Sequence, residues 1–191
     1  MSTPSEAEDV KLISSLFSSD KPLIERVIDR LKEMFGPADW ISPWLLFDRT
    51  RYYEKEMGWP LHRRLVSFRN LIRPEAIVDV KLQTNRLGGE YSIDGRRMIN
   101  LDPGYITLER MVLATGKNYT HRIYLAKGIY ADLTLAFHRG AFSALEWTYR
   151  DYADPVFIGY LNDLREMYKR QVRGLEHGPE IADRNKPKNG G

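Results

Sequence analysis

The chain has 191 residues, of which 42% are hydrophobic and 29% charged, a balance that excludes a disordered chain and fits one globular domain. It contains no cysteine, which excludes disulfides, thiolate nucleophiles, iron–sulfur clusters and cysteine-based zinc sites. The formal net charge of +3 comes from a mixed-sign sequence and argues against nucleic acid as a partner.

The first part of the chain predicts a strand, a helix and a second strand. Residues 11–18 alternate loosely, as in a strand. Asp20 and Pro22 mark the start of a helix with apolar residues at helical spacing, and Gly36-Pro37 ends it. The aromatic and apolar residues 40–47 then favour a strand.

The middle of the chain repeats this order. Residues 48–58 read as a loop or short helix, and residues 63–72 as a strand. A helix is expected from Pro74 to about residue 87, followed by a strand at residues 97–101 that runs into a turn at Asp102-Pro103-Gly104. The order β-α-β-β-α-β predicts an α+β protein with a ferredoxin-like core.

An added hairpin and a terminal helix follow the predicted core. Residues 107–115 predict a short helix ending at Gly116. A β-hairpin is expected from strands at residues 122–125 and 129–137, with a further strand at residues 141–145.

The last helix has the strongest start signal in the chain, because Asp154 suits the N-cap and Pro155 the first helical position. We expect a flexible N-terminus at residues 1–10, a single domain at residues 11–173 and a flexible tail at residues 174–191. No apolar stretch is long enough for a membrane span, and the polar N-terminus does not resemble a signal peptide, so we expect a cytoplasmic location without membrane contact.

Several common chemistries leave no trace in the sequence. It contains no GxxxxGK[ST], GxGxxG or GxSxG motif. None of the four histidines lies in a familiar metal-ligand spacing, so no metal site is expected. The pairs Arg63-Arg64 and Arg96-Arg97 are too short for a nucleic-acid patch and are interpreted as solvated charges at strand ends.

Polar and aromatic residues concentrate in three segments. In residues 48–58 they either pack a surface helix against the sheet or supply carboxylates and a phenol to a site. In residues 100–105 they either tie off a turn or present a ligand site at a strand end. Alternation along the predicted hairpin predicts a polar face with Arg122, Tyr124, Tyr130, Asp132 and Thr134 and an apolar face with Ile123, Leu125, Ile129, Leu133 and Leu135. The polar face is either solvated or lines an anion-binding groove. Lys127 falls on the apolar side, so a bulge or a carboxylate contact is expected there. The candidate ligand-binding residues are Asp48, Tyr53, Glu56, Asn100, Asp102, Lys117, His121, Arg122, Lys127, Tyr130 and Asp132.

The same segments resemble a bacterial family known as domain of unknown function 4416. The similarity covers about residues 11–169 and lies in FDRTRYYEKEMG, LIRPEAIVDVKLQTN, NLDPGYITLERMVLATGKN, HRIYLAKGIYADLTL and WTYRDY. The resemblance implies no activity, cofactor or catalytic residue.

Three functions are compatible with these residues. The favoured hypothesis is a protein that binds, and in one version acts on, a small anionic or phosphorylated ligand such as a nucleotide. The second is a protein- or RNA-interaction module in which Tyr124 and Tyr130 share a face. The third is a homodimer formed through exposed tyrosines. No reaction or cofactor follows from the residues.

Overall fold

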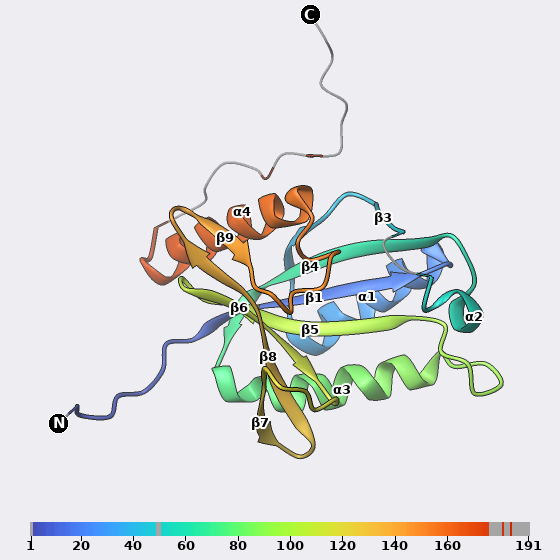
Figure 1. The fold of residues 1–191 in the computed structure, drawn as a ribbon, viewed down its shortest axis with the longest axis horizontal. Helices are drawn as coiled ribbons and strands as arrows, with labels where there is room; N and C mark the ends of the chain where they lie inside the picture. The colour runs from blue at the N-terminus through green and yellow to red at the C-terminus, as the bar shows by residue number, and fades with distance from the viewer. Residues whose placement is uncertain (1, 49–50, 176–180, 182–183, 185–191) are drawn as a thin grey trace, which may run out of the picture.

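The computed structural model describes residues 2–48, 51–175, 181 and 184, and shows an α+β fold built on a large antiparallel sheet (Figure 1). The strands are β1 (Val10–Ser18), β2 (Ala38–Ile41), β3 (Leu45–Phe47), β4 (Leu61–Ile72), β5 (Asn100–Ile106), β6 (Arg110–Thr115), β7 (Arg122–Ala126), β8 (Ile129–His138) and β9 (Ala141–Ala144). The helices are α1 (Lys21–Phe35), α2 (Glu54–Met57), the short 3₁₀ helix η1 (Pro74–Ala76), α3 (Ile77–Glu90) and α4 (Pro155–Val172).

All strand pairs in the sheet are antiparallel, in the order β2-β4-β1-β5-β6-β8-β7, with β3 beside β4 and β9 beside β8. The sheet is covered on both faces. Leu12 and Leu16 of β1 belong to a core that includes the apolar sides of α1 and α3, whereas Ile13 belongs to a second core with α4. Strand β1 is therefore buried at every position and reads as an apolar run with weak alternation.

The predicted ends of two helices are confirmed. The Asp20 side chain accepts a hydrogen bond from the backbone N–H of Leu23 at 3.0 Å, and α1 ends before Gly36, whose φ of 95° suits glycine. The Asp154 side chain accepts from the N–H of Val156 at 2.9 Å at the start of α4. The expected strands at residues 11–18 and 63–72, the hairpin and the strand at residues 141–145 are also present.

The turn predicted at Asp102-Pro103-Gly104 and the helix predicted at residues 107–115 are wrong. Strand β5 continues through Pro103 and Gly104 to Ile106, and the chain turns only where the N–H of Thr107 bonds the carbonyl of Arg110 at 2.9 Å. The following strand β6 is buried on both faces from Met111 to Ala114. It therefore lacks the two-residue alternation that distinguishes a strand from a helix.

Smaller differences concern residues 40–47 and α3. The expected single strand is divided into β2 and β3, because the Ser42 backbone and hydroxyl bond to Leu65 between them. Helix α3 continues past Gly88-Gly89 to Glu90. The proposed tail begins with described residues 174–175, but most of it lies outside the described residues, and so does part of the segment at residues 48–58.

The hairpin of β7 and β8 keeps its predicted pairing but not its predicted burial. Ile123 and Leu125, expected on the apolar face, are exposed on the edge strand β7. Asp132, expected on the polar face, is buried. Lys127 has a φ of 52° in the turn and contacts Asp79 at 2.7 Å, which supplies the expected carboxylate contact.

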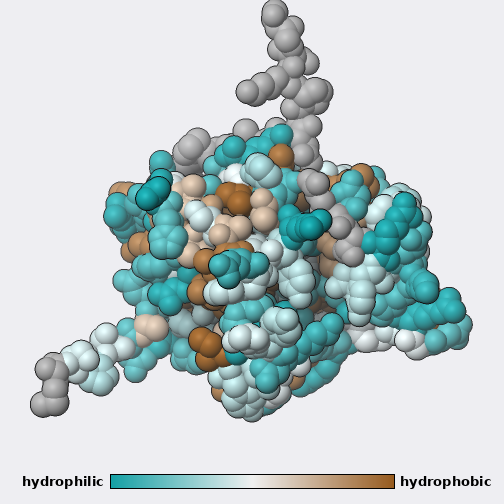
Figure 2. All heavy atoms as spheres, in the orientation of Figure 1, coloured by the Kyte–Doolittle hydropathy of each residue, from teal (hydrophilic) through white to brown (hydrophobic). Residues whose placement is uncertain are grey.

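Figure 2 shows hydrophobic residues in small groups on a largely hydrophilic face.

Candidate functional site

The cavity between diverging strands

Strands β5 and β6 separate after a short stretch of pairing, and this opening positions the candidate site. Only Gly104–Ile106 and Met111–Leu113 pair with one another, while the rest of β6 remains paired with β8 (Figure 1). Pro103, which has no backbone N–H, comes directly before the last pair. Helix α3 contacts β5, β6 and β8 and so spans the opening.

Gly104 allows the close approach of the two strands where they separate. A Cβ atom at this position would lie 2.3 Å from the Val112 carbonyl oxygen, well inside van der Waals contact. Any other residue here would force β5 and β6 apart. The glycine in the sequence Asp102-Pro103-Gly104 therefore serves strand packing and not a turn.

A cavity of about 810 Å³ occupies the opening. This volume falls within the range of small-molecule sites. Its walls come from β1, β3, β4, β5, β6, β7, β8 and α3, and from the segments before α2 and α4. The lining residues that carry the argument below are Phe17, Phe47, Tyr53, Arg63, Lys81, Arg97, Asn100, Asp102, Lys117, Arg122, Asp132, Tyr149, Arg150, Asp151 and Tyr152.

Charged groups of the cavity

Lys81 projects from α3 to Leu101 of β5, in the part of β5 that does not pair with β6. Its residue is 8% exposed, and its Nζ donates a hydrogen bond to the Leu101 carbonyl at 2.9 Å. The nearest Asp102 carboxylate oxygen is 3.9 Å away. Burial lowers the pKa of Lys81, opposed by the charge of Asp102 and assisted by the charges of Arg97 and Lys117.

A chain of side-chain hydrogen bonds leads from α2 to Asp102. Glu56 accepts from Arg97 at 2.9 Å, Arg97 donates to Asn100 Oδ1 at 2.7 Å, and Asn100 Nδ2 donates to Asp102 at 2.7 Å. Burial would lower the pKa of Arg97, but the hydrogen bond and charge of Glu56 raise it above its ordinary value. This series of hydrogen bonds fixes the Asp102 carboxylate beside Lys81.

Tyr53 lies next to this chain. Burial first, and the charge of Asp102 second, raise its pKa to about 12. The phenol is therefore protonated at neutral pH, and it can donate a hydrogen bond to a ligand but cannot act as a base there.

Asp132 joins two neighbouring residues on the opposite wall. It accepts a hydrogen bond from Arg122 Nε at 2.8 Å and lies 3.2 Å from His121 Nε2, whose ring stacks on Trp147. Arg122 also donates to the Tyr149 hydroxyl at 3.1 Å. The burial of Asp132 is thus explained by its partners.

Arg63 is a buried cation, which corrects the interpretation of Arg63-Arg64 as solvated. The residue is 3% exposed, donates to Asp151 at 2.5 Å, and stands 4.4 Å from the Phe47 ring centroid. Because Arg63 alternates with Leu61 and Leu65 on β4, the two-residue pattern already placed it on a buried face. The neighbouring Tyr152 phenol is fully enclosed, and its burial raises its pKa.

Two cations that line the cavity have side chains without a partner among the described residues. Within the described part of the chain, the side chains of Lys117 and Arg150 form no hydrogen bond or ion pair. Arg63, Lys81, Arg97 and Arg122 face Asp151, Asp102, Glu56 and Asp132 respectively. The cavity therefore carries an excess of positive charge that comes from Lys117 and Arg150.

Aromatic rings form one wall of the cavity. Phe17 stacks on Phe47 with ring centroids 4.4 Å apart, and Tyr53 meets Phe17 edge to face at 4.9 Å. Tyr149 and Tyr152 also line the space. This wall offers a flat apolar surface beside the cationic groups.

Comparison with the sequence expectations

The structure brings six of the eleven predicted residues to this cavity: Tyr53, Asn100, Asp102, Lys117, Arg122 and Asp132. Glu56 and His121 contact lining residues. Asp48 lines a separate hollow, Lys127 contacts Asp79, and Tyr130 packs against Tyr124.

The sequence reasoning missed Arg63, Lys81, Arg97, Arg150 and Asp151. For Lys81 a signal existed, since it lies three and four residues after the buried Val78 and Ile77 and so shares the apolar side of α3. Arg150 and Asp151 lie in the segment WTYRDY, which the resemblance had singled out without assigning them a role.

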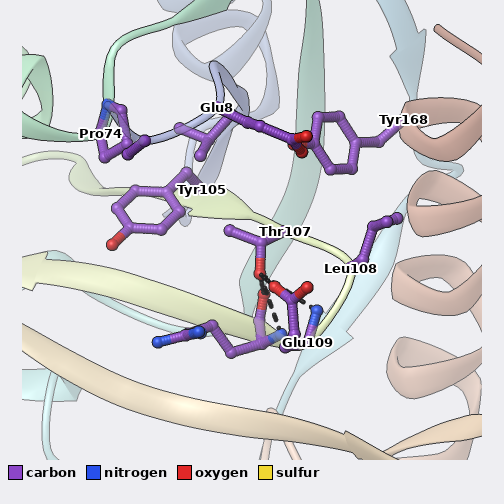
Figure 3. Close-up of a pocket in the computed structure, with 10 residues that line it drawn as sticks. Glu8, Pro74, Tyr105, Thr107, Leu108, Glu109 and Tyr168 are labelled. Atoms are coloured by element: carbon purple, nitrogen blue, oxygen red, sulfur yellow. Dashed lines mark hydrogen bonds between the residues drawn. The ribbon is translucent and has the colours of Figure 1, made fainter. Parts of the chain in front are cut away.

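A second, smaller hollow of about 310 Å³ lies near Tyr168 of α4 and the turn between β5 and β6 (Figure 3). At the turn that borders it, the Thr107 hydroxyl donates to Glu109 at 2.8 Å and accepts from the N–H of Arg110 at 3.1 Å.

Comparisons with known proteins

A family model described as domain of unknown function (DUF4416) matches residues 8–168. The chain belongs to this family. The match confirms the resemblance stated from the sequence and includes every element that lines the cavity. No curated protein and no solved structure gave a match.

None of the helices in the described residues is long and apolar enough to cross a membrane. The described residues also contain no group of three or more His, Cys, Asp or Glu side chains arranged to hold a metal ion.

Proposed function

We propose that this protein binds a small anionic ligand in the cavity between β5 and β6. The observation that carries the proposal is a pair of cationic side chains, Lys117 and Arg150, which form no hydrogen bond or ion pair with any described residue. They stand at a cavity whose carboxylates already face other cations. Phosphate and carboxylate groups are the natural partners of such cations.

The aromatic wall favours a ligand with a flat or apolar part attached to its anionic group. Phe17 and Phe47 offer such a surface, and Asn100 and Tyr53 supply polar groups for orientation. A nucleotide combines a ring with phosphates and fits this description. The aromatic residues and the cations come from different elements, so a ligand of this kind would bridge the opening.

The arrangement of the sheet suits this role. We propose that β2, β4, β1 and β5, with α1 and α3 on one face, form a ferredoxin-like unit. In that description β6 to β9 and α4 are the additions that build the second side of the cavity.

Isothermal titration with inorganic pyrophosphate and with a nucleoside triphosphate tests the anion site. The double variant Lys117→Ala/Arg150→Ala should weaken binding about tenfold or more, since each charge-assisted contact contributes roughly 1.5–3 kcal/mol when formed. Both side chains are exposed, so the fold should be unaffected. The matched control is Lys127→Ala, an exposed lysine outside the cavity.

Thermal unfolding gives an independent measure. A ligand at 100 times its Kd adds about 2.7 kcal/mol to the free energy of unfolding, which should raise the Tm by roughly 5–10 °C.

Two outcomes of the titration would contradict the proposal. One is equal affinity of the unaltered chain, the double variant and Lys127→Ala, and the other is no binding of either anion by the unaltered chain. A larger loss for the nucleotide than for pyrophosphate in a Phe47→Ala variant would support the role of the aromatic wall.

A further inference from the structure

Lys81 differs from the other cations of the cavity in its surroundings. Arg63, Arg97 and Arg122 each donate directly to a carboxylate, whereas Lys81 donates to a neutral backbone carbonyl and stands 3.9 Å from Asp102. It lines the cavity with Asn85, which lies one turn further along the same face of α3. An amine held this way is fixed in position without being neutralised by a close ion pair.

We propose that Lys81 is the reactive group of the cavity and forms an imine with the carbonyl carbon of a phosphorylated or otherwise anionic aldehyde or ketone. This inference rests on the proposed anion site and narrows its ligand class. A desolvated lysine amine in a cavity is the usual nucleophile for reversible addition to a carbonyl group.

The environment favours the neutral amine that such chemistry needs. Burial lowers the pKa of Lys81, and the nearby charges of Arg97 and Lys117 act in the same direction, while Asp102 opposes them. A neutral amine still has an N–H to donate to the Leu101 carbonyl, and its lone pair remains available to the cavity. Lys117 and Arg150 would hold the anionic group of the ligand.

The reaction balances without a further reactant. The nitrogen lone pair attacks the carbonyl carbon and the carbonyl oxygen becomes a hydroxyl. The nitrogen gives up its protons as water leaves and the C=N bond forms. Asp102 is held by Asn100 at 2.7 Å, with its nearest oxygen 3.9 Å from Nζ. Through one water molecule it would take a proton from the nitrogen and return it to the departing oxygen. The products are the imine and one water molecule.

The test uses the full chain with micromolar pyridoxal 5′-phosphate as a phosphorylated aldehyde probe, followed by borohydride reduction and peptide mass spectrometry. We expect one dominant adduct at Lys81, lost in Lys81→Met and retained in Lys127→Met. Pyridoxal without the phosphate should label Lys81 at least tenfold more slowly. Asp102→Asn should slow labelling by about tenfold while leaving pyrophosphate binding at least as tight.

The outcomes separate this inference from the anion site. If Lys81→Met binds pyrophosphate as the unaltered chain does but forms no adduct, both proposals are supported. If pyrophosphate binds and the adducts are scattered over exposed lysines, with no preference for Lys81, the imine proposal is wrong and the anion site stands. If pyrophosphate does not bind and Lys81 is not labelled, both proposals are overturned.

Discussion

Two buried lysines in this protein show how the same side chain can serve the fold or a site. Lys11 of β1 is 1% exposed; it forms an ion pair with Asp39 of β2 and donates to Gln171 of α4 at 3.1 Å. Asp39 also accepts from the Ser67 hydroxyl at 2.6 Å. Lys11 therefore joins β1 directly to β2 and α4, and Asp39 extends the network to Ser67 of β4.

Lys81 is almost as buried but has no such network. The one hydrogen bond that its side chain makes to a described residue goes to a backbone carbonyl, and the side chain borders the cavity. Burial lowers the pKa of both lysines, so the pKa direction does not separate them. The distance to a carboxylate does separate them, because Lys11 forms a close ion pair with Asp39, whereas the nearest Asp102 oxygen is 3.9 Å from Lys81. The two lysines should therefore respond differently to substitution.

The largest effect is expected at the Lys11 network. Asp39→Ala removes the partner of a buried cation, and breaking such a pair costs about 3–5 kcal/mol. Urea unfolding should show this loss in the free energy of unfolding. The control is Asp79→Ala, which breaks the exposed pair with Lys127 and should cost less than about 1 kcal/mol. Equal losses in the two variants would show that Lys11 is not a structural lysine.

The contrast between these lysines also shows what the sequence can and cannot predict. The caps at Asp20 and Asp154 act through neighbours two or three residues away, and they were predicted correctly. Lys11 and Asp39 are far apart in the chain, and no local sequence pattern predicts their contact. The sequence did single out residues of β5 and the hairpin that line the cavity, because polar side chains concentrate in those segments and such a concentration is a local signal.

The shape of the cavity could not be predicted from the sequence for a related reason. It depends on β6 leaving β5 after three pairs, and β6 was predicted as a helix because both its faces are buried. With that strand misassigned, Gly104 looked like a turn residue and Lys81 had no neighbour to suggest a role. The structural roles of β6, Gly104 and Lys81 all depend on long-range strand pairing, which a local sequence pattern does not reveal.

A second prediction concerns the point where the strands separate beside Lys81. Gly104→Ala places a Cβ atom 2.3 Å from the Val112 carbonyl, which the backbone must relieve by moving. We expect a loss of about 1–3 kcal/mol in the free energy of unfolding, as for other overpacked positions. In Gly116→Ala the new Cβ meets no atom within 4 Å, so this variant should be close to neutral. Labelling of Lys81 by pyridoxal 5′-phosphate should also slow in Gly104→Ala. If the rate equals that of the unaltered chain, the position of Lys81 does not depend on how the strands separate.

The smallest effect, and the most informative one, is expected at Lys81 itself. Lys81→Met removes a buried amine without leaving a close ion-pair partner, so the free energy of unfolding at pH 7 should stay equal or rise by up to about 1 kcal/mol. The folded pKa lies below the ordinary value of 10.5, so between those two values the unfolded chain binds more protons. The unaltered chain therefore gains stability as the pH rises through that window, and the advantage of Lys81→Met should shrink toward pH 10.5. Urea unfolding of both proteins at pH 7, 8.5 and 10 measures this difference. A large loss of stability at pH 7 would place Lys81 with Lys11 as a structural lysine and would remove the distinction on which the imine proposal depends.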